Sequence, residues 1–357
     1  MSGIRSQRLL SGMIVAAVAG AASPALAIDD AVVTRIDSGH VAVEWKDADP
    51  VSVFVSAVRQ ADRKGARAVA KADRSGRVVV ASQVNERRYF LLRDHGDRSV
   101  LRVAERVLPL EQGSNFRDIG GYKGADGKHV AWGKVFRSGA MPLLTEADYG
   151  MLEQLKISTI VDLRSTDERM IAPNMLDDRT GAIFISNDYS LKGLMANYGK
   201  GDGEYAYRGM DTFLKPQLKQ VFASLLRNEG AVMYHCSAGQ DRTGITTALI
   251  YSALGVDRAT ILKDYHLSTE LRRPQFEMPP LDPADWPGNP IVPYYVASMK
   301  KPGGPKAEPL FTSKGNSHLA QFLEMVEKDY GSVTAYLDKE LGVDADDIKR
   351  LKALYLE

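Results

Sequence analysis

A buried strand, a short glycine-containing loop and an apolar helix follow one another directly between residues 231 and 255, and this succession constrains the fold most. The run AVMYH at 231–235 is almost wholly apolar, which is typical of a parallel strand covered on both faces. The run RTGITTALIYSALG at 242–255 places apolar residues one turn apart and stops at Gly255, as a helix does. We therefore expect a parallel sheet covered by helices.

The same alternation continues along most of the chain. TEADYGMLEQL begins with a Thr145 cap and is typical of a helix, and ISTIVDL at 157–163 is typical of a buried strand. DTFLKPQLKQVFASLLRN predicts a helix with a proline kink or start at Pro216, and three further helical patterns follow residue 317. These patterns predict one α/β domain over residues 110–357, with a central, mostly parallel sheet flanked by helices.

A proline-rich segment at 274–317 interrupts this domain. It holds ten of the sixteen prolines of the chain, which is typical of a loop or lid with one short helix rather than of a core element. Segments of this length inside a compact domain are usually functional or mobile.

Residues 28–107 show a different pattern, with no helical period. Seven short valine-rich runs alternate with turn sequences such as DSG, DRSG and DHGD, which predicts an all-β sandwich. Trp45 and Tyr89 stand where a fibronectin type III or immunoglobulin-like sandwich has a core tryptophan and a late-strand tyrosine, so the segment resembles that class. Such modules mostly bind or position other proteins, so a protein partner is expected here.

The first 27 residues have the pattern of a signal peptide. Arg5 and Arg8 precede the apolar stretch LLSGMIVAAVAGAA, and small residues end at Ala27, which suits a signal peptidase. This pattern predicts export to the periplasm or outside a bacterial cell, and an uncleaved anchor is the alternative. The net charge of +1 provides no field that would attract nucleic acid, so no nucleic-acid partner is expected.

The loop HCSAGQDRTG contains Cys236, the one cysteine of the chain. The backbone N–H groups of Ser237, Ala238, Gly239 and Gln240 are expected to converge at the positive end of the following helix. Such a site binds an anion and favours a thiolate over a thiol, which makes Cys236 a candidate nucleophile. The alternative is a buried structural cysteine, as most single cysteines after a strand are.

Three neighbours of Cys236 suit the same chemistry. The planar guanidinium of Arg242 can bind two oxygens of a phosphate at once. Thr243 is expected to donate a hydroxyl hydrogen bond to the thiolate, and His235 to fix the loop backbone. The six histidines show no metal-binding spacing, so neither a metal nor another cofactor is expected.

Cys-x5-Arg-Thr after a strand, with a preceding histidine, is the signature of the cysteine-dependent protein tyrosine phosphatase superfamily. Together with SNFRDIGGY, VFRSGAM, IVDLRSTDER and the terminal YGSVTAYLDKELGV, the loop resembles the bacterial tyrosine-phosphatase-like family, which includes secreted triple-specificity and atypical lipid phosphatases. The resemblance covers residues 110–357. It implies a metal-independent phosphomonoesterase that forms a phosphocysteine and acts on phosphoproteins or phosphoinositides.

Three aspartates compete for the role of the acid that protonates the leaving group. Asp162, in VDLRS at the end of a buried strand, matches the position assigned to this family's acid, and the structural alternative is an ion pair with Arg164 or Arg117. Asp241 lies inside the loop and is the second choice. Asp188 stands at the end of another expected strand.

Three further expectations concern the site and its use. The segment NFRD at 115–118 is expected to hold the wall of the site, with Arg137 paired to Asp118. Gln240 stands where related loops that favour phosphoinositides often have lysine, which weakens an inositol-lipid interpretation. The alternative function is a secreted binding or adhesion protein that uses the phosphatase fold as an anion-binding scaffold.

Overall fold

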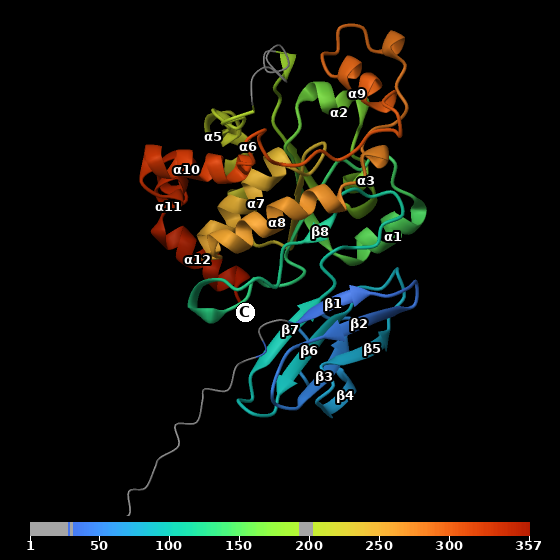
Figure 1. Cartoon of the computed structure of the whole chain (residues 1–357), viewed down its shortest axis with the longest axis vertical. Coiled ribbons are helices and arrows are strands. Elements are labelled where there is room, and N and C mark those ends of the chain that lie inside the picture. The colour runs from blue at the N-terminus through green and yellow to red at the C-terminus, as the bar shows by residue number, and fades with distance from the viewer. Residues whose placement is uncertain (1–27, 29–30, 193–202) are drawn as a thin grey trace, which may run out of the picture.

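The computed structural model describes residues 28, 31–192 and 203–357, and every structural statement refers to these residues. The expected signal peptide at 1–27 lies outside them. No helix of this described part is long and apolar enough to cross a bilayer. Figure 1 shows the N-terminal strands grouped at one end of the molecule and the helix-rich remainder at the other.

The N-terminal part consists of seven strands, one at each of the seven valine-rich runs. They form two antiparallel sheets, one in the order β1-β2-β5 and the other in the order β4-β3-β6-β7. The strands are β1 Val32–Arg35, β2 His40–Glu44, β3 Val51–Ser56, β4 Arg67–Asp73, β5 Arg77–Ala81, β6 Tyr89–Asp94 and β7 Val100–Ala104.

The two N-terminal sheets share one hydrophobic core. Val43 of β2 and Phe90 of β6 lie in it, and Trp45 fills it from the end of β2. Tyr89 lies outside this core and packs instead against Trp132 of the C-terminal part. Tyr89 of β6 therefore contributes to the contact between the N-terminal and C-terminal parts and not to the core between the two N-terminal sheets.

The C-terminal part contains a five-stranded sheet in the order β11-β10-β12-β9-β8. Neighbouring strands are parallel except that β8 runs antiparallel to β9, so the expected mostly parallel sheet is confirmed. The fully buried β12 lies at the centre. The strands are β8 Arg117–Asp118, β9 Val135–Ser138, β10 Ile157–Asp162, β11 Ile183–Ser186 and β12 Ala231–His235.

Alternate residues of this sheet face two separate hydrophobic cores. Val232 and Tyr234 of β12 pack into the core that contains Leu249 of α7 (Asp241–Leu254). Met233 points to the opposite core, which contains Leu152 of α1 (Glu146–Gln154). Coverage on both faces explains why the AVMYH run has no polar face.

The sequence signals at the helix ends are confirmed. Thr145 caps α1 in a reciprocal capping box with Asp148. Pro216 lies in the first turn of α6, so it starts a helix rather than kinking one. Gly255 ends α7 with a left-handed φ of 77°. The other helices are α2 Thr166–Ile171, α3 Leu176–Thr180, α5 Met210–Phe213, α6 Lys215–Arg227, α8 Arg258–Leu271, α9 Val292–Met299, α10 His318–Tyr330, α11 Val333–Tyr336 and α12 Ala345–Tyr355.

Four short helical turns complete the chain, and two of them lie in the proline-rich segment 274–317 with α9. Ile291 and Val292 of this segment pack against Ile171 at the end of α2. Figure 1 shows α9 beside α2, at the end of the molecule away from the N-terminal strands. The turns are η1 Ala125–Gly127, η2 Pro274–Phe276, η3 Pro283–Asp285 and η4 Leu337–Leu341.

Buried polar contacts join the N-terminal strands to the C-terminal part. Arg87 donates to the Asp118 carboxylate at 2.5 Å, and both side chains are almost inaccessible to solvent. The Trp132 indole donates to the carbonyl of Arg102 at 3.0 Å. Removing either member of this pair would leave an uncompensated buried charge, which costs about 3–5 kcal/mol.

Candidate active site

The loop between β12 and α7 carries the residues that the sequence assigns to the chemistry. β12 ends at His235, α7 begins at Asp241, and the loop turns at Gly239, whose φ is 67°. A side chain on residue 239 would come within 2.6 Å of the Ser138 backbone, so the turn requires glycine. The strand thereby delivers Cys236 to the N-terminal end of a 14-residue helix.

Donors from outside the loop hold its carbonyl groups. The Asn115 side chain donates to the carbonyls of Ala238 at 3.1 Å and Gly239 at 2.9 Å. Arg137 also donates to the Gly239 carbonyl at 2.8 Å, and the backbone N–H of Ala140 donates to the Ser237 carbonyl at 2.8 Å. Asn115 therefore supports the wall of the site, as expected for its segment.

The backbone N–H groups of the same loop have no protein partner. Among the hydrogen bonds of the described residues, none is donated by the backbone N–H of Ser237, Ala238, Gly239 or Gln240. Outside donors hold the carbonyls of Ser237, Ala238 and Gly239, and the first turn of α7 holds that of Gln240, so the four residues present their N–H groups as an anion site at the positive end of α7. Cys236 begins this loop and is only 1% exposed.

Arg242, in the first turn of α7, forms a two-point ion pair with Glu168 of α2. Its Nη2 lies 2.5 Å from Oε1 and its Nη1 lies 2.7 Å from Oε2, and Nη1 also donates to the Tyr189 hydroxyl at 2.8 Å. Burial alone would raise the pKa of Glu168, but the Arg242 charge and several hydrogen bonds lower it to about 2. The carboxylate therefore stays ionised and fixes the guanidinium beside the loop.

Glu168 is a site residue that the sequence interpretation missed, although it lies in the motif IVDLRSTDER. Ser165-x-x-Glu168 is a capping box, which predicts only the start of a helix, and the structure shows that box at the start of α2. The same carboxylate accepts from the Ser237 hydroxyl at 2.6 Å. One side chain thus caps α2, supports the loop and holds Arg242. Tyr189, the hydroxyl partner of Arg242, was missed as well.

Asp162 ends β10, but Arg164 occupies its carboxylate. Oδ1 accepts from the Arg164 N–H and Nε, both at 2.9 Å, and Oδ2 accepts from Nη2 at 2.7 Å. Burial alone would raise the pKa of Asp162, but the charges of the neighbouring His235 and of the Arg164 guanidinium hold it well below its usual value. The structural ion pair with Arg164 is therefore present, and a fully buried, ionised carboxylate is poorly suited to donate a proton.

Asp241 is the first residue of α7 and remains partly exposed. The Tyr207 hydroxyl donates to its Oδ1, and Tyr207 is also bonded to the Tyr265 hydroxyl at 2.6 Å. Burial raises the pKa of both tyrosines, so both remain neutral donors. The third candidate, Asp188, pairs with Arg169 and has a side chain that is 85% exposed. Asp241 alone combines a fixed carboxylate with a place in the loop.

Two of the expected roles around Cys236 have different outcomes. The Thr243 hydroxyl is buried and finds no hydrogen-bond partner among the described residues, so the expected bond to the thiol is not formed in this structure. His235 lies 3.3 Å from the Cys236 carbonyl through Nδ1 and 2.9 Å from the Asn174 amide through Nε2. Burial lowers the His235 pKa to about 4, so the ring is neutral at pH 7, and its contact with the Cys236 carbonyl lies at the start of the loop.

Gln240 is enclosed by residues from the end of α8 and the proline-rich segment. Arg272 donates to its Oε1 at 2.7 Å, and its Nε2 donates to the Glu308 carbonyl at 3.4 Å. Arg272 also forms a two-point ion pair with Glu277. A cavity of about 190 Å³ adjoins these residues and is lined by Arg272, Tyr295 and two lysines. The position that carries lysine in related loops therefore holds a neutral amide bonded to an arginine.

Arg137 pairs differently from the expectation. Its Nη1 donates to Asp264 of α8 at 2.9 Å, and Asp264 also accepts from Arg117 at 3.2 Å. Asp118, the expected partner, is bound by Arg87 from the N-terminal part. Asp264 lies 127 residues from Arg137 in the chain, within ILKDYHLS, which is part of the family resemblance, but that motif does not show which arginine Asp264 binds.

Comparison with known proteins gives a consistent result over the C-terminal part. The model of the Tyrosine phosphatase family matches residues 108–357. A tyrosine-protein phosphatase of Nostoc commune is 31% identical over 226 residues, which cover 60% of this chain and 72% of that protein. The triple specificity protein phosphatase PtpB of Mycobacterium tuberculosis is 26% identical over 293 residues, which cover 71% of this chain and all of that protein.

Among solved structures, TpbA of P. aeruginosa is 20% identical and covers 39% of this chain and 71% of its own, but a TM-score of 0.25 is too low to bear on the fold. The family match spans more than half of the chain and contains the whole loop, Arg242 and Glu168. The chain therefore belongs to the tyrosine phosphatase family.

Proposed function

We propose that this chain is a metal-independent phosphomonoesterase of the protein tyrosine phosphatase type that works through a phosphocysteine intermediate. The observation that carries the proposal is the loop with four free N–H groups, which begins at Cys236 and is flanked by the fixed guanidinium of Arg242. An anion-binding scaffold needs the N–H groups and the guanidinium, but it has no use for a thiol at this point.

The reaction proceeds in two steps. The Cys236 thiolate attacks phosphorus while the bond from phosphorus to the leaving oxygen breaks, and the loop N–H groups and Arg242 hold the other three oxygens. An acid gives the leaving oxygen a proton. The acid is thereby left as a carboxylate. Water then attacks phosphorus of the phosphocysteine and gives a proton to this carboxylate, and phosphate and the Cys236 thiolate are released.

We assign the acid to Asp241 rather than Asp162. Asp241 is partly exposed and belongs to the loop, whereas Asp162 is ionised, inaccessible and bound to Arg164. Asp241→Asn should slow turnover of alkyl phosphates by about 10²–10⁴-fold and of para-nitrophenyl phosphate much less, because a good leaving group needs no acid. Asp162→Asn should affect both substrates equally. The opposite pattern would restore Asp162 as the acid.

The alternative is a secreted binding or adhesion protein with an inactive phosphatase fold. Hydrolysis of para-nitrophenyl phosphate in the presence of a chelator separates the two functions. Wild-type protein should turn over the substrate, and Cys236→Ser should be inactive while it still binds orthovanadate or a phosphotyrosyl peptide. Equal rates for the two proteins would exclude the phosphocysteine mechanism.

The substrate class that we propose is a phosphorylated protein, with phosphotyrosine as the main target and dual or triple specificity as the extension. The names of the Nostoc commune and Mycobacterium tuberculosis relatives support this range. The neutral Gln240, bonded to Arg272, favours phosphopeptides over phosphoinositides. A panel of phosphotyrosyl, phosphoseryl and phosphothreonyl peptides, phosphoinositides and inositol phosphates would rank them by kcat/KM.

We also propose the following organisation of the chain: a cleaved signal peptide at 1–27, a sandwich of the fibronectin type III or immunoglobulin-like class at 28–107, and the phosphatase domain at 110–357. The family match from residue 108 and the two N-terminal sheets support these boundaries. Export predicts a mature protein in the periplasm or the medium that begins at Ile28, which N-terminal sequencing would test. The sandwich is proposed to bind a protein partner.

A further inference from the structure

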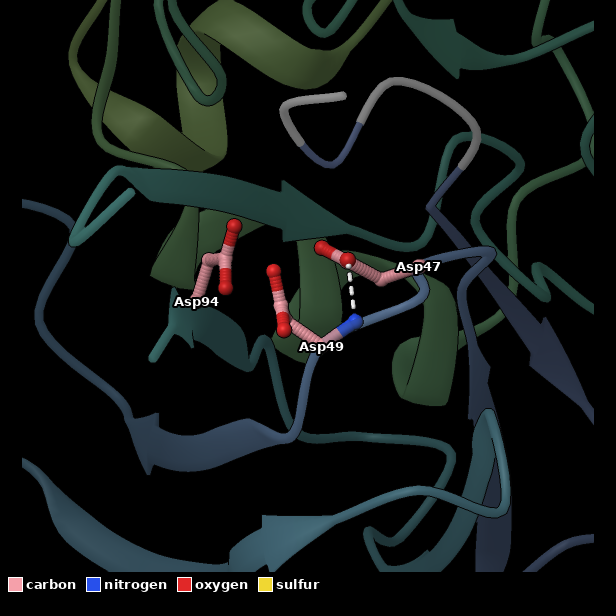
Figure 2. A group of neighbouring side chains, drawn as sticks. All are labelled: Asp47, Asp49 and Asp94. Carbon is pink, nitrogen blue, oxygen red and sulfur yellow. Dashed lines mark hydrogen bonds between the residues drawn. The ribbon is translucent and has the colours of Figure 1, made fainter. Parts of the chain in front are cut away.

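Three aspartates converge at one end of the N-terminal sheets, far from Cys236 in the sequence. Asp47 and Asp49 lie in the turn between β2 and β3, and Asp94 is the last residue of β6. Each offers one carboxylate oxygen, and these oxygens all lie within 4.8 Å of one another. Figure 2 shows the three side chains turned toward a common point. Three negative charges in so small a volume repel one another strongly.

The free oxygen of Asp94 is the observation that points to a ligand. Asp94 is inaccessible to solvent, and while its Oδ1 accepts from the Gly96 N–H at 2.7 Å, its Oδ2 has no hydrogen-bond partner among the described residues. Asp47 repeats this arrangement, because its Oδ1 accepts from the Asp49 N–H at 2.9 Å and its buried Oδ2 has none (Figure 2). A buried carboxylate oxygen without a partner is costly, which indicates that a cation completes it.

Within the described part of the chain, no side-chain cation forms an ion pair with the cluster, although Arg74 donates to the Ala48 carbonyl in the same turn at 3.1 Å. The ion pairs formed within the described part of the chain include none to Asp47, Asp49 or Asp94.

The backbone around the cluster leaves room for the carboxylates. A side chain on Gly96 would come within 2.0 Å of the Asp49 Oδ2, so the turn after β6 needs a residue without a side chain here. The turn sequences DADP at 47–50 and DHGD at 94–97 therefore bring the acidic groups together.

We propose that Asp47, Asp49 and Asp94 bind one calcium ion that joins the β2–β3 turn to the end of β6. All the donors are carboxylate oxygens, which hard divalent cations prefer, and oxygens within 4.8 Å of one another can bind a single ion. Calcium accepts a flexible shell of six to eight oxygens, whereas magnesium demands near-ideal octahedral geometry, so calcium is the cation that we propose. Asp47 and Asp49 are partly exposed, so water can complete the shell. This site departs from the expectation that the chain binds no metal, and it is independent of the phosphatase chemistry.

Calcium titration of the full chain tests the proposal by isothermal calorimetry and by thermal unfolding. Sites of this type in extracellular modules bind with a Kd of roughly 0.1–1 mM. Wild-type protein should bind one calcium ion per chain, and about 10 mM calcium should raise its unfolding temperature by roughly 2 °C or more relative to chelated protein. Magnesium at the same concentration should have a smaller effect.

Asp94→Asn should remove calcium binding. In the presence of a chelator, this variant should unfold at the wild-type temperature or above it, because the neutral amide relieves the repulsion among the three carboxylates. If this variant does not fold, the more exposed Asp49→Asn serves the same purpose. Asp62→Asn is the matched control, since Asp62 is an exposed turn aspartate in the same part of the chain whose Oδ1 accepts from two backbone N–H groups. It should bind calcium as wild type does. A wild-type protein that binds no calcium, or an Asp94→Asn variant with unchanged affinity, would overturn the proposal.

Discussion

Replacing Glu168 by glutamine tests whether one carboxylate both stabilises the fold and positions the reacting arginine. Its pKa falls from 4.5 to about 2 in the folded protein, where Arg242 holds it. This lowering of the Glu168 pKa corresponds to about 3 kcal/mol of stability at neutral pH. Because the folded pKa lies below the unfolded one, this stabilisation is complete well above about pH 4.5 and is lost as the pH falls toward 2.

Urea unfolding of wild type and Glu168→Gln at pH 7 and pH 3.5 measures this contribution. The difference in unfolding free energy between the two proteins should shrink by roughly 1 kcal/mol at the lower pH, because part of the ionisation advantage of Glu168 is already lost there. The variant should also lose about 10²-fold in kcat/KM, since the guanidinium is no longer held in place.

The control for this experiment is Glu153→Gln, because Glu153 lies 3.9 Å from Arg179 in an exposed ion pair worth little stability. It should leave the pH dependence of unfolding and the activity unchanged. If the wild-type and Glu168→Gln free energies differ by the same amount at both pH values, the proposed ionised pair with Arg242 does not exist.

Three further predictions concern the loop. Asn115→Gly should cost about 1–3 kcal/mol in unfolding free energy and lower kcat, because the loop carbonyls lose two donors, and Asn115→Ala should cost more, because residue 115 has a φ of 56°. Gly239→Ala should abolish turnover of para-nitrophenyl phosphate, because the added methyl group would collide with the Ser138 backbone. Gly150→Ala is the control: residue 150 lies in α1 with open space around it, so this variant should raise the unfolding free energy, measured by thermal unfolding, by about 0.5–1 kcal/mol. His235→Gln should flatten the pH dependence of the unfolding free energy between about pH 6.5 and 4, where wild type loses stability because the unfolded histidine binds a proton and the buried one does not.

The fold and the loop that contains Cys236 could be predicted from the sequence because their signals are local. Hydrophobic period, turn residues and caps such as Thr145 and Gly255 depend on a few neighbouring residues. Cys236 and Arg242 stand six residues apart, so their spacing alone indicated a shared site.

The supporting contacts could not be read because they join distant segments. Glu168 reaches Arg242 across 74 residues, and its capping box gave no sign of a second role. Asp162 had an acid's position in the motif, but the choice between proton donor and ion pair depends on how Arg164 folds back, which no spacing shows. The partner of Arg137 likewise follows from how α8 packs beside the sheet.

The single thiol of the chain has a practical consequence. Since Cys236 is the one cysteine, any thiol-reactive reagent that labels the protein labels the proposed nucleophile, so the labelled fraction counts intact sites without a kinetic assay. The side chain is only 1% exposed, so the rate of labelling reports how often the protein opens enough to expose the thiol. If phosphate or a phosphopeptide slows the labelling of Cys236, the decrease in rate measures the fraction of sites that the ligand occupies.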